Sequence, residues 1–344
     1  MIRIGVIGYG YWGPNLVRNF HETPGAVVAR VSDLRPERLA LVSSRYPAIA
    51  VSESHRELID DPAVDAVAIA TPVRTHFELA LRALQAGKHV FVEKPLASSS
   101  QQVQQLIEAA RRADRTLMVD HTFVYTGAVR KIRQLVEDGS VGDIYYYDST
   151  RVNLGLFQHD VNVIWDLAVH DLSIMDYVMP CPPVAVSATG LSHVAGTTEN
   201  VAFLTLFFDG PQIAHLHVNW LAPVKVRRTL IGGSRKMIVY DDLEHSEKVK
   251  VYDKGITLNR QTDASEKMYQ TLVGYRTGDM LAPNLDGAEA LKVEAAHFVD
   301  CVSHGRQPLT DGAAGLRVVQ ILEAATASMK ERGRPVELPS AVLS

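Results

Sequence analysis

A glycine-rich turn, Gly8-x-Gly10-x-x-Gly13, constrains the fold of this chain more than any other stretch. It follows an apolar run over residues 2–7 and precedes a helical pattern that begins at about Pro14. In a dinucleotide site the three glycines permit, in order, a tight strand-to-helix turn, close approach of a pyrophosphate, and close helix–strand packing. The free N–H groups of the helix N-terminus attract phosphate. On this motif alone, a glycine-rich turn in another kind of α/β unit remains an alternative.

The context of the turn favours a dinucleotide site. A second strand-like run over residues 26–32 ends at Asp33, where an acid that binds the ribose hydroxyls belongs. Such a carboxylate favours NAD, whereas Arg35 could stack on adenine or compensate the 2′-phosphate of NADP. The alternative reading of Asp33 is a helix cap before Pro36. The predicted cofactor loop also contains Tyr11 and Trp12.

Composition narrows the class of protein. The chain has 344 residues, of which 47% are hydrophobic, and its net charge is −4. This length favours two domains, and the spread of charge gives no basic run for nucleic acid or a membrane surface. Two cysteines without a CxxC pair make a disulfide framework or a cysteine-based zinc site unexpected. No signal peptide or membrane span is expected, so we expect a cytoplasmic protein.

The first third of the chain alternates strands with helices. The expected strands are 2–7, 26–32, 48–51, 64–70, 89–92 and 116–119, and the expected helices are 14–22, 36–46, 55–59, 75–86 and 101–113. Such alternation predicts an α/β fold with a parallel, doubly wound sheet. We therefore assign residues 1–121 to a Rossmann dinucleotide-binding domain.

The pattern changes after Asp120. A long strand at about 142–152 is followed by strand-like runs at 184–191, 200–208, 212–220, 226–232, 235–240 and 247–252. Helices are expected near 127–138, 165–178, 287–303 and 312–332. Residues 122–344 are thus predicted to form an α/β domain on a large, mostly antiparallel sheet that binds substrate and mediates oligomerisation. Helices should cover one face of the sheet, and the other face is either a subunit interface or covered by a further helix.

Two short motifs follow strands of the first domain. Thr71 and Pro72 end the strand at 64–70, and ligands in open α/β sheets bind at the carboxyl ends of strands. His76 lies just beyond and is read as a capping or packing residue or a cofactor contact. Glu93 and Lys94 end the strand at 89–92, where the ammonium could bind a substrate oxygen or lower the pKa of a base. The alternative is a solvated Lys–Glu pair.

A second motif, Asp166-x-x-x-His170, lies in a predicted helix. Side chains four residues apart share a helical face, so the carboxylate could orient the imidazole for proton transfer with an alcohol. The alternatives are a buried histidine satisfied by a helix neighbour and a His/Asp metal pair, which lacks a clear further set of ligands. We expect no metal.

Other polar residues are candidates for contact with a substrate. Arg151, Asn153 and Asn162 lie in a loop-like stretch between strand and helix, and His121 and Tyr125 follow the last strand of the first domain. Structural polarity of the loops is the alternative for all five.

Together these motifs resemble the glucose–fructose oxidoreductase / inositol dehydrogenase family, Gfo/Idh/MocA, over essentially the whole chain. The resemblance rests on the glycine motif, Asp33, Ala70-Thr71-Pro72 with His76, Glu93-Lys94-Pro95, Asp166-x-x-x-His170, and the tail with Pro308 and Gly315. It implies a Rossmann domain followed by an open-faced sheet that often forms dimers or tetramers. It also implies metal-free oxidation of a sugar or cyclitol hydroxyl with NAD(H) or NADP(H).

The resemblance also implies the roles of three residues. His170 would be the general base, Lys94 would polarise the reacting oxygen, and Asp166 would orient His170 or bind the adjacent hydroxyl. The family often has a glycine-rich turn before this helix, and residues 158–165 differ from it. That departure is similar to branches that act on nucleotide-linked or otherwise modified sugars.

We therefore expect an NAD-dependent sugar dehydrogenase or ketoreductase, acting at a secondary hydroxyl such as C3 of a nucleotide-linked or phosphorylated sugar. Alternatives on the same scaffold are an inositol or other cyclitol dehydrogenase and an enzyme that cleaves glycosides through transient oxidation. A non-catalytic dinucleotide-binding sensor is the alternative of another class, and the presence of Lys94 and His170 argues against it.

Overall fold

The computed structural model describes residues 1–155, 161–258 and 273–339. Within these residues the chain forms two compact units, one of residues 1–126 with 288–323 and one of residues 127–287 with 324–344. The first break falls near the boundary expected from the sequence. The expected continuous second domain of residues 122–344 differs from this division, because residues 288–323 pack with the first unit.

The first unit is built on a six-stranded parallel sheet in the order β3-β2-β1-β4-β5-β6. Its strands are β1 (Ile2–Ile7), β2 (Ala26–Ser32), β3 (Ala50–Ser52), β4 (Ala66–Ile69), β5 (His89–Glu93) and β6 (Leu117–Asp120). Its helices are α1 (Gly13–Glu22), α2 (Pro36–Arg45), α3 (His55–Asp60), α4 (His76–Gln85), α5 (Ser100–Ala113) and α9 (Ala290–His304), with short turns η1 (Val73–Thr75) and η2 (Thr122–Tyr125). The predicted Rossmann sheet is confirmed.

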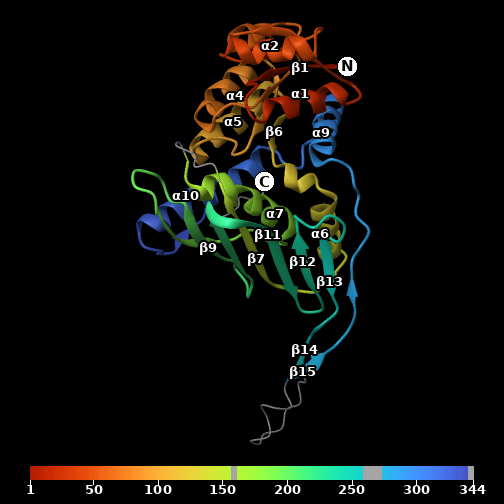
Figure 1. Cartoon of the computed structure of the whole chain (residues 1–344), viewed down its shortest axis with the longest axis vertical. Coiled ribbons are helices and arrows are strands. Elements are labelled where there is room, and N and C mark those ends of the chain that lie inside the picture. Colours follow the sequence, from red (N-terminus) through yellow and green to blue (C-terminus); the bar gives the residue numbers. More distant parts are fainter. Residues whose placement is uncertain (156–160, 259–272, 340–344) are drawn as a thin grey trace, which may run out of the picture. The chain divides into compact units, whose positions relative to one another are not determined.

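Helix α9 belongs to this unit because it completes an aromatic core. Phe298 of α9 packs edge-on against Phe20 of α1 and Phe91 of β5, with ring centroids 6.0 and 5.5 Å apart. All three side chains are fully buried. Burial of such rings supplies much of the free energy of a core. In Figure 1, α9 therefore lies beside α1 although almost the whole chain separates them.

The second unit is built on a nine-stranded sheet in the order β16-β13-β12-β11-β7-β10-β9-β8-β17. Its strands are β7 (Ile144–Leu154), β8 (Ala185–Leu191), β9 (Val201–Phe207), β10 (Ile213–Asn219), β11 (Leu221–Gly233), β12 (Met237–Asp241), β13 (Val249–Tyr252), β16 (Met280–Leu281) and β17 (Val336–Glu337). A separate hairpin pairs β14 (Gly255–Leu258) with β15 (Val273–Arg276). The helical elements are α6 (Gly127–Glu137), η3 (Ile164–Ala168) and α7 (Val169–Val178), and α10 (Gly312–Lys330) has residues in both units.

The nine-stranded sheet is mostly antiparallel, as predicted, with one parallel pair between β7 and β10. Figure 1 shows β7, β11, β12 and β13 running side by side. Alternate residues of β7 point to opposite faces. Tyr147, Ser149 and Arg151 are buried on the face that carries α7, and the next residues along the strand belong to the other face. This alternation determines which side chains reach the helix.

In the part of the chain that the structure describes, no helix is both long enough and apolar enough to cross a bilayer.

Candidate active site

Backbone atoms crowd the first and last glycines of the glycine-rich loop, whereas the space above its middle glycine is open. Gly8 has φ +95°, and a Cβ there would lie 2.5 Å from the carbonyl oxygen of Ala70. A Cβ on Gly13 would lie 2.1 Å from the carbonyl oxygen of Gly8. A Cβ on Gly10, by contrast, would meet only the Arg35 guanidinium, at 3.5 Å. Larger residues are thus excluded at the two ends, while the space over Gly10 suits a pyrophosphate.

Helix α1 begins directly after this loop. Trp12 is the N-cap residue and has a helical backbone conformation, and no described side chain caps the helix. The neighbouring Tyr11 is 91% exposed. An uncapped helix start presents its N–H groups and the positive end of its dipole to an anion. The loop and helix therefore fit the phosphates of a dinucleotide.

Asp33, at the end of β2, is already surrounded by donors. Its Oδ2 accepts a hydrogen bond of 2.7 Å from the backbone N–H of Tyr9, and its Oδ1 accepts one of 2.9 Å from Nε of Arg35. Burial acts to raise the pKa of Asp33, but these hydrogen bonds more than offset it, so the pKa is lowered. A carboxylate of this kind fits the hydroxyls of an adenine ribose, and the half-exposed Arg35 lies beside it.

His76 joins two turns at the carboxyl edge of the sheet. Its Nδ1 lies 2.9 Å from the carbonyl oxygen of Pro95, and its Nε2 lies 2.8 Å from the carbonyl oxygen of Thr71. The side chain is 1% exposed, and burial lowers its pKa. These contacts agree with the packing interpretation of His76. Pro72 is exposed at the same edge, and the Thr71 hydroxyl accepts a hydrogen bond from Thr75.

Glu93 and Lys94 lie at the end of β5. The backbone N–H of Lys94 donates to Oε2 of Glu93 at 3.2 Å. The other oxygen of Glu93 is buried, and burial together with the neighbouring Asp120 raises the pKa of this carboxyl well above its usual range. Glu93 is therefore not the solvated half of an ion pair, and its side chain supports the main chain that carries Lys94.

His121 and Tyr125 are buried in the first unit. Burial lowers the pKa of His121 to about 4, so its ring is neutral at physiological pH. Burial also raises the pKa of Tyr125, whose hydroxyl lies 3.2 Å from Oγ1 of Thr310. Exposed fractions of 2% and 1% favour a structural role for these residues over the substrate contact expected from the sequence.

The Asp166-x-x-x-His170 motif begins in a π-helical turn. The helix expected over 165–178 is instead a π-turn, η3, that continues into α7. Such turns occur often at functional sites. Oδ2 of Asp166 accepts a hydrogen bond of 3.1 Å from Nε1 of Trp220, which is fully buried. The carbonyl oxygen of His170 accepts one from the Ser173 hydroxyl.

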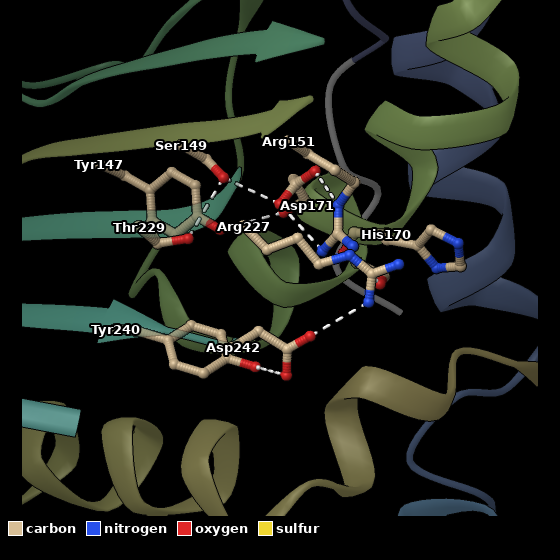
Figure 2. Close-up of polar contacts among 10 residues, drawn as sticks. Tyr147, Ser149, Arg151, His170, Asp171, Arg227, Thr229, Tyr240 and Asp242 are labelled. Atoms are coloured by element: carbon tan, nitrogen blue, oxygen red, sulfur yellow. Dashed lines mark hydrogen bonds and ion pairs between the residues drawn. The ribbon is translucent and has the colours of Figure 1, made fainter. Parts of the chain in front are cut away.

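Asp171, next to His170, anchors this helix to the sheet. It forms a buried ion pair with Arg151, in which Nε lies 2.7 Å from Oδ2 and Nη2 lies 3.2 Å from Oδ1. The Ser149 hydroxyl donates to Oδ1 at 2.8 Å and lies 3.2 Å from the hydroxyl of Thr229. Figure 2 shows the His170 imidazole directed away from these two hydroxyls. The ion pair thus fixes the turn from which His170 projects.

Arg151 is held by this pairing. Burial acts to lower the pKa of its guanidinium, but the charge of Asp171 more than offsets it, so the pKa is raised. Two of its nitrogens bind Asp171, and the residue is 3% exposed. These contacts favour a role in positioning the helix over the substrate contact expected from the sequence.

Asn162 caps the same helical segment. Its Oδ1 accepts hydrogen bonds from the backbone N–H groups of Ile164 and Trp165, at 3.2 and 3.3 Å. Asparagine oxygens often accept the free N–H groups at the start of a helix, so these contacts favour a structural role for Asn162 over the substrate contact expected from the sequence. Asn153 lies half-buried near the end of β7. Residues 156–160, part of the polar stretch expected to select substrate, lie outside the described residues.

Three residues of this architecture were not assigned to the site from the sequence. Asp171 and Trp220 support the helical segment of His170, and Glu294 lies beside Glu93 and Asp120 in the first unit. A buried acid adjoining a catalytic motif gives little signal in one sequence. Trp220 and Glu294 are far from their partners along the chain, so only the fold brings them together.

Two family models match the chain. Residues 2–121 match the oxidoreductase family with an NAD-binding Rossmann fold, and residues 129–239 match the GFO/IDH/MocA C-terminal domain. The two matches cover most of both units. They agree with the six-stranded sheet, the glycine-rich loop and the mixed sheet described above.

Characterised relatives are distant and span the whole length. The chain is 26% identical to myo-inositol 2-dehydrogenase of Thermotoga maritima, over 99% of this chain and 100% of that protein. It is 28% identical to UDP-N-acetylglucosamine 3-dehydrogenase of Acidithiobacillus ferrooxidans, over 92% and 94%. The structure of levoglucosan dehydrogenase in complex with NADH superposes with a TM-score of 0.82 over 98% and 99% at 21% identity, a likeness of fold.

Proposed function

Because the chain belongs to the Gfo/Idh/MocA family of NAD(P)-dependent oxidoreductases, we propose that it oxidises a secondary hydroxyl of a sugar, or reduces the corresponding ketone. The preferred substrate is a nucleotide-linked or phosphorylated sugar that reacts at C3. The main support from the structure is the π-turn that bears Asp166 and the first turn of α7 that bears His170, braced by Trp220 and by the Arg151–Asp171 ion pair. Such bracing limits the motion of a group that must transfer a proton in one geometry.

The proposed steps use three side chains. His170 accepts the proton of the reacting hydroxyl, Asp166 orients His170 or binds the adjacent hydroxyl, and Lys94 stabilises charge on the reacting oxygen. A bound nicotinamide cofactor would supply or accept the hydride. Gly8, Gly10 and Gly13 give the pyrophosphate its space, and the α1 N-terminus provides the N–H groups. Asp33 would bind the adenine ribose, which favours NAD over NADP.

The choice of substrate class rests on the relatives and on the departure before η3. A UDP-sugar 3-dehydrogenase among the relatives supports a nucleotide sugar, and the full-length match to a myo-inositol dehydrogenase supports a cyclitol as the second candidate. A panel of nucleotide sugars, phosphorylated sugars and cyclitols, each with NAD and with NADP, tests both assignments through formation of the reduced cofactor. Release of a fragment without net reduction would instead indicate transient oxidation with glycoside cleavage.

Two substitutions test the assigned catalytic residues. We expect Lys94→Met and His170→Ala to lower kcat about a hundredfold or more, the range for loss of a positioned acid or base, while NADH binding persists. His245→Ala is the matched control, because that histidine lies in the exposed loop between β12 and β13. Unchanged turnover in both variants would exclude this catalytic site.

We also propose a homodimer or homotetramer formed through the face of the nine-stranded sheet that bears Phe203. On this face, the pairing of β9 with β10 places Phe207 opposite Ile213. The Phe203 ring stacks on the His217 ring, with ring centroids 4.5 Å apart. Phe203, Phe207 and Ile213 are 42%, 36% and 44% exposed, an apolar set typical of an interface. Phe203→Glu should dissociate the oligomer in light scattering, and a monomeric wild-type protein would contradict the proposal.

A further inference from the structure

Three carboxyl groups meet where β5 and β6 end in the first unit. Glu93 and Asp120 occupy paired positions of the two parallel strands, and Glu294 reaches them from α9. Glu294 is 0% exposed and Asp120 is 1% exposed. Burial of several like charges at one point is costly, so this arrangement needs a source of compensation.

Asp120 is the common acceptor of this cluster. Its Oδ2 accepts a hydrogen bond of 3.1 Å from Nε1 of Trp12, and its Oδ1 accepts one from the hydroxyl of Thr122. The indole contact is the link to the cofactor loop, because Trp12 lies in that loop and is the N-cap residue of α1. Asp120 therefore ties the glycine-rich loop to the end of β6.

The hydrogen bonds of the cluster require bound protons. The proximity of Asp120 raises the pKa of both Glu93 and Glu294, and two carboxyl oxygens can share a hydrogen bond only when one of them is protonated. Neither oxygen of Glu294 accepts a well-formed hydrogen bond within the described part of the chain; the Thr122 hydroxyl acts to lower the pKa of Glu294, but it donates to Oδ1 of Asp120. Burial, and after it the charge of Asp120, raises the pKa of Glu294 well above its usual range.

The other titratable groups around the cluster leave this proton in place. The ammonium of Lys94, on the β5 side, acts to lower the pKa of Glu93, but burial and Asp120 outweigh it. His121, after β6, has a pKa lowered to about 4 by burial and is neutral. On η2, the pKa of the Tyr125 phenol is raised by burial and by Glu294. The proton of Glu294 is thus its means of bonding to Asp120.

We propose that Glu294 is a positioning residue for the dinucleotide loop: its protonated carboxyl donates to Asp120, and Asp120 in turn holds the Trp12 indole. Glu93 extends the network, because its Oε2 accepts from the backbone N–H of Lys94. Loss of the Glu294 proton turns a hydrogen bond into repulsion and adds negative charge behind a loop that binds pyrophosphate. Cofactor affinity should therefore fall at alkaline pH.

The test is the affinity of the full-length protein for NADH as a function of pH, followed by NADH fluorescence. We expect the wild-type affinity to fall about fivefold from neutral to alkaline pH, the equivalent of one hydrogen bond of about 1 kcal/mol. Glu294→Gln should bind within about twofold of wild type at neutral pH and lose this pH dependence, since an amide donates without titrating. Glu294→Leu, without a donor, should bind about fivefold more weakly at every pH.

Glu289→Gln is the matched control. It makes the same chemical change one turn earlier, next to the start of α9, but Glu289 is 44% exposed and pairs with Arg18. It should keep the wild-type pH profile. An unaltered pH profile in Glu294→Gln, or an equal flattening in Glu289→Gln, would overturn the proposal. The measurement requires no sugar, so it is independent of the substrate assignment above.

A second readout separates positioning from loss of fold. If Glu294 acts through Trp12, then Glu294→Leu in a Trp12→Phe background should cost much less NADH affinity than in the wild type, because the indole bond is already lost. A Tm of Glu294→Gln at neutral pH no lower than that of the wild type would show that its fold is intact. Full additivity of the two substitutions would contradict the role of Trp12.

Discussion

The two units bury charge in opposite ways. In the second unit, Asp171 faces the guanidinium of Arg151 and the hydroxyl of Ser149, so a cation and a neutral donor compensate it. In the first unit, Glu93 and Glu294 face Asp120, and protons compensate the cluster. The first arrangement is insensitive to pH over the physiological range, because an arginine stays protonated. The second depends on pH through the carboxyls themselves.

The difference has a functional consequence. The ion pair braces the helix of the proposed general base, which must keep its position while His170 itself gains and loses a proton. The carboxyl cluster lies behind the cofactor loop, where its protonation can influence binding. Permanent charges thus support the proposed proton-transfer group, and titratable ones support the loop that holds the dinucleotide.

The largest effect should come from breaking the ion pair. Arg151→Met leaves Asp171 buried without its cation, and we expect a loss of about 3–5 kcal/mol in the free energy of unfolding. Denaturant unfolding followed by circular dichroism measures it. The double variant Arg151→Met with Asp171→Leu should recover much of that loss, since no charge is left buried. A loss well under about 1 kcal/mol in the single variant would contradict the account.

A smaller, pH-dependent effect is expected at the carboxyl cluster. The pKa of Glu294 is raised on folding, so the folded protein binds more protons than the unfolded chain between the two pKa values. Its contribution to the free energy of unfolding therefore falls as pH rises through that window. Relative to the wild type, Glu294→Gln should gain Tm as pH rises from near the ordinary pKa of a glutamic acid, about 4.3, toward alkaline pH. A constant difference in Tm across this range would show that Glu294 does not titrate there.

The smallest effect should come from a neutral donor of the ion-paired cluster. Ser149→Ala removes the hydrogen bond to Oδ1 of Asp171 but leaves the guanidinium in place, so we expect a loss of about 1 kcal/mol in the free energy of unfolding. Its kcat should change little if Arg151 alone holds the helix. A loss as large as that of Arg151→Met would show that the hydroxyl, and not the cation, compensates Asp171.

Much of the fold followed from local signals. The strands that end at Ile7, Ser32, Ile69, Glu93 and Asp120 are apolar runs, and their alternation with helices predicted the parallel sheet. The helix at 165–178 was found, but not its opening π-turn, because side-chain periodicity does not reveal how the backbone bonds. The strands β16 and β17 are two residues long and too short for a recognisable pattern.

The residues of the candidate site likewise differ in whether local sequence signals could reveal their roles. The glycines, Asp33, Glu93, Lys94, Asp166 and His170 were recognisable because backbone approach, strand ends and helical spacing are local properties. Whether a polar residue faces a substrate or a buried partner is not local. Arg151 looked like a ligand for a sugar, and the structure pairs it with Asp171 across the sheet and helix.

The sequence by itself determined which side chains stand at the end of each strand and to which family the chain belongs. Only the tertiary structure decided which of those side chains are buried, and whether a cation, a neutral donor or a bound proton compensates each buried charge. Glu294 is the clearest case: along the chain it is one acid in an amphipathic helix, and in the fold it is fully buried against Asp120. The physical reason is that desolvation and the proximity of other charges arise only when distant segments pack together, and these two effects determine the protonation of a carboxyl.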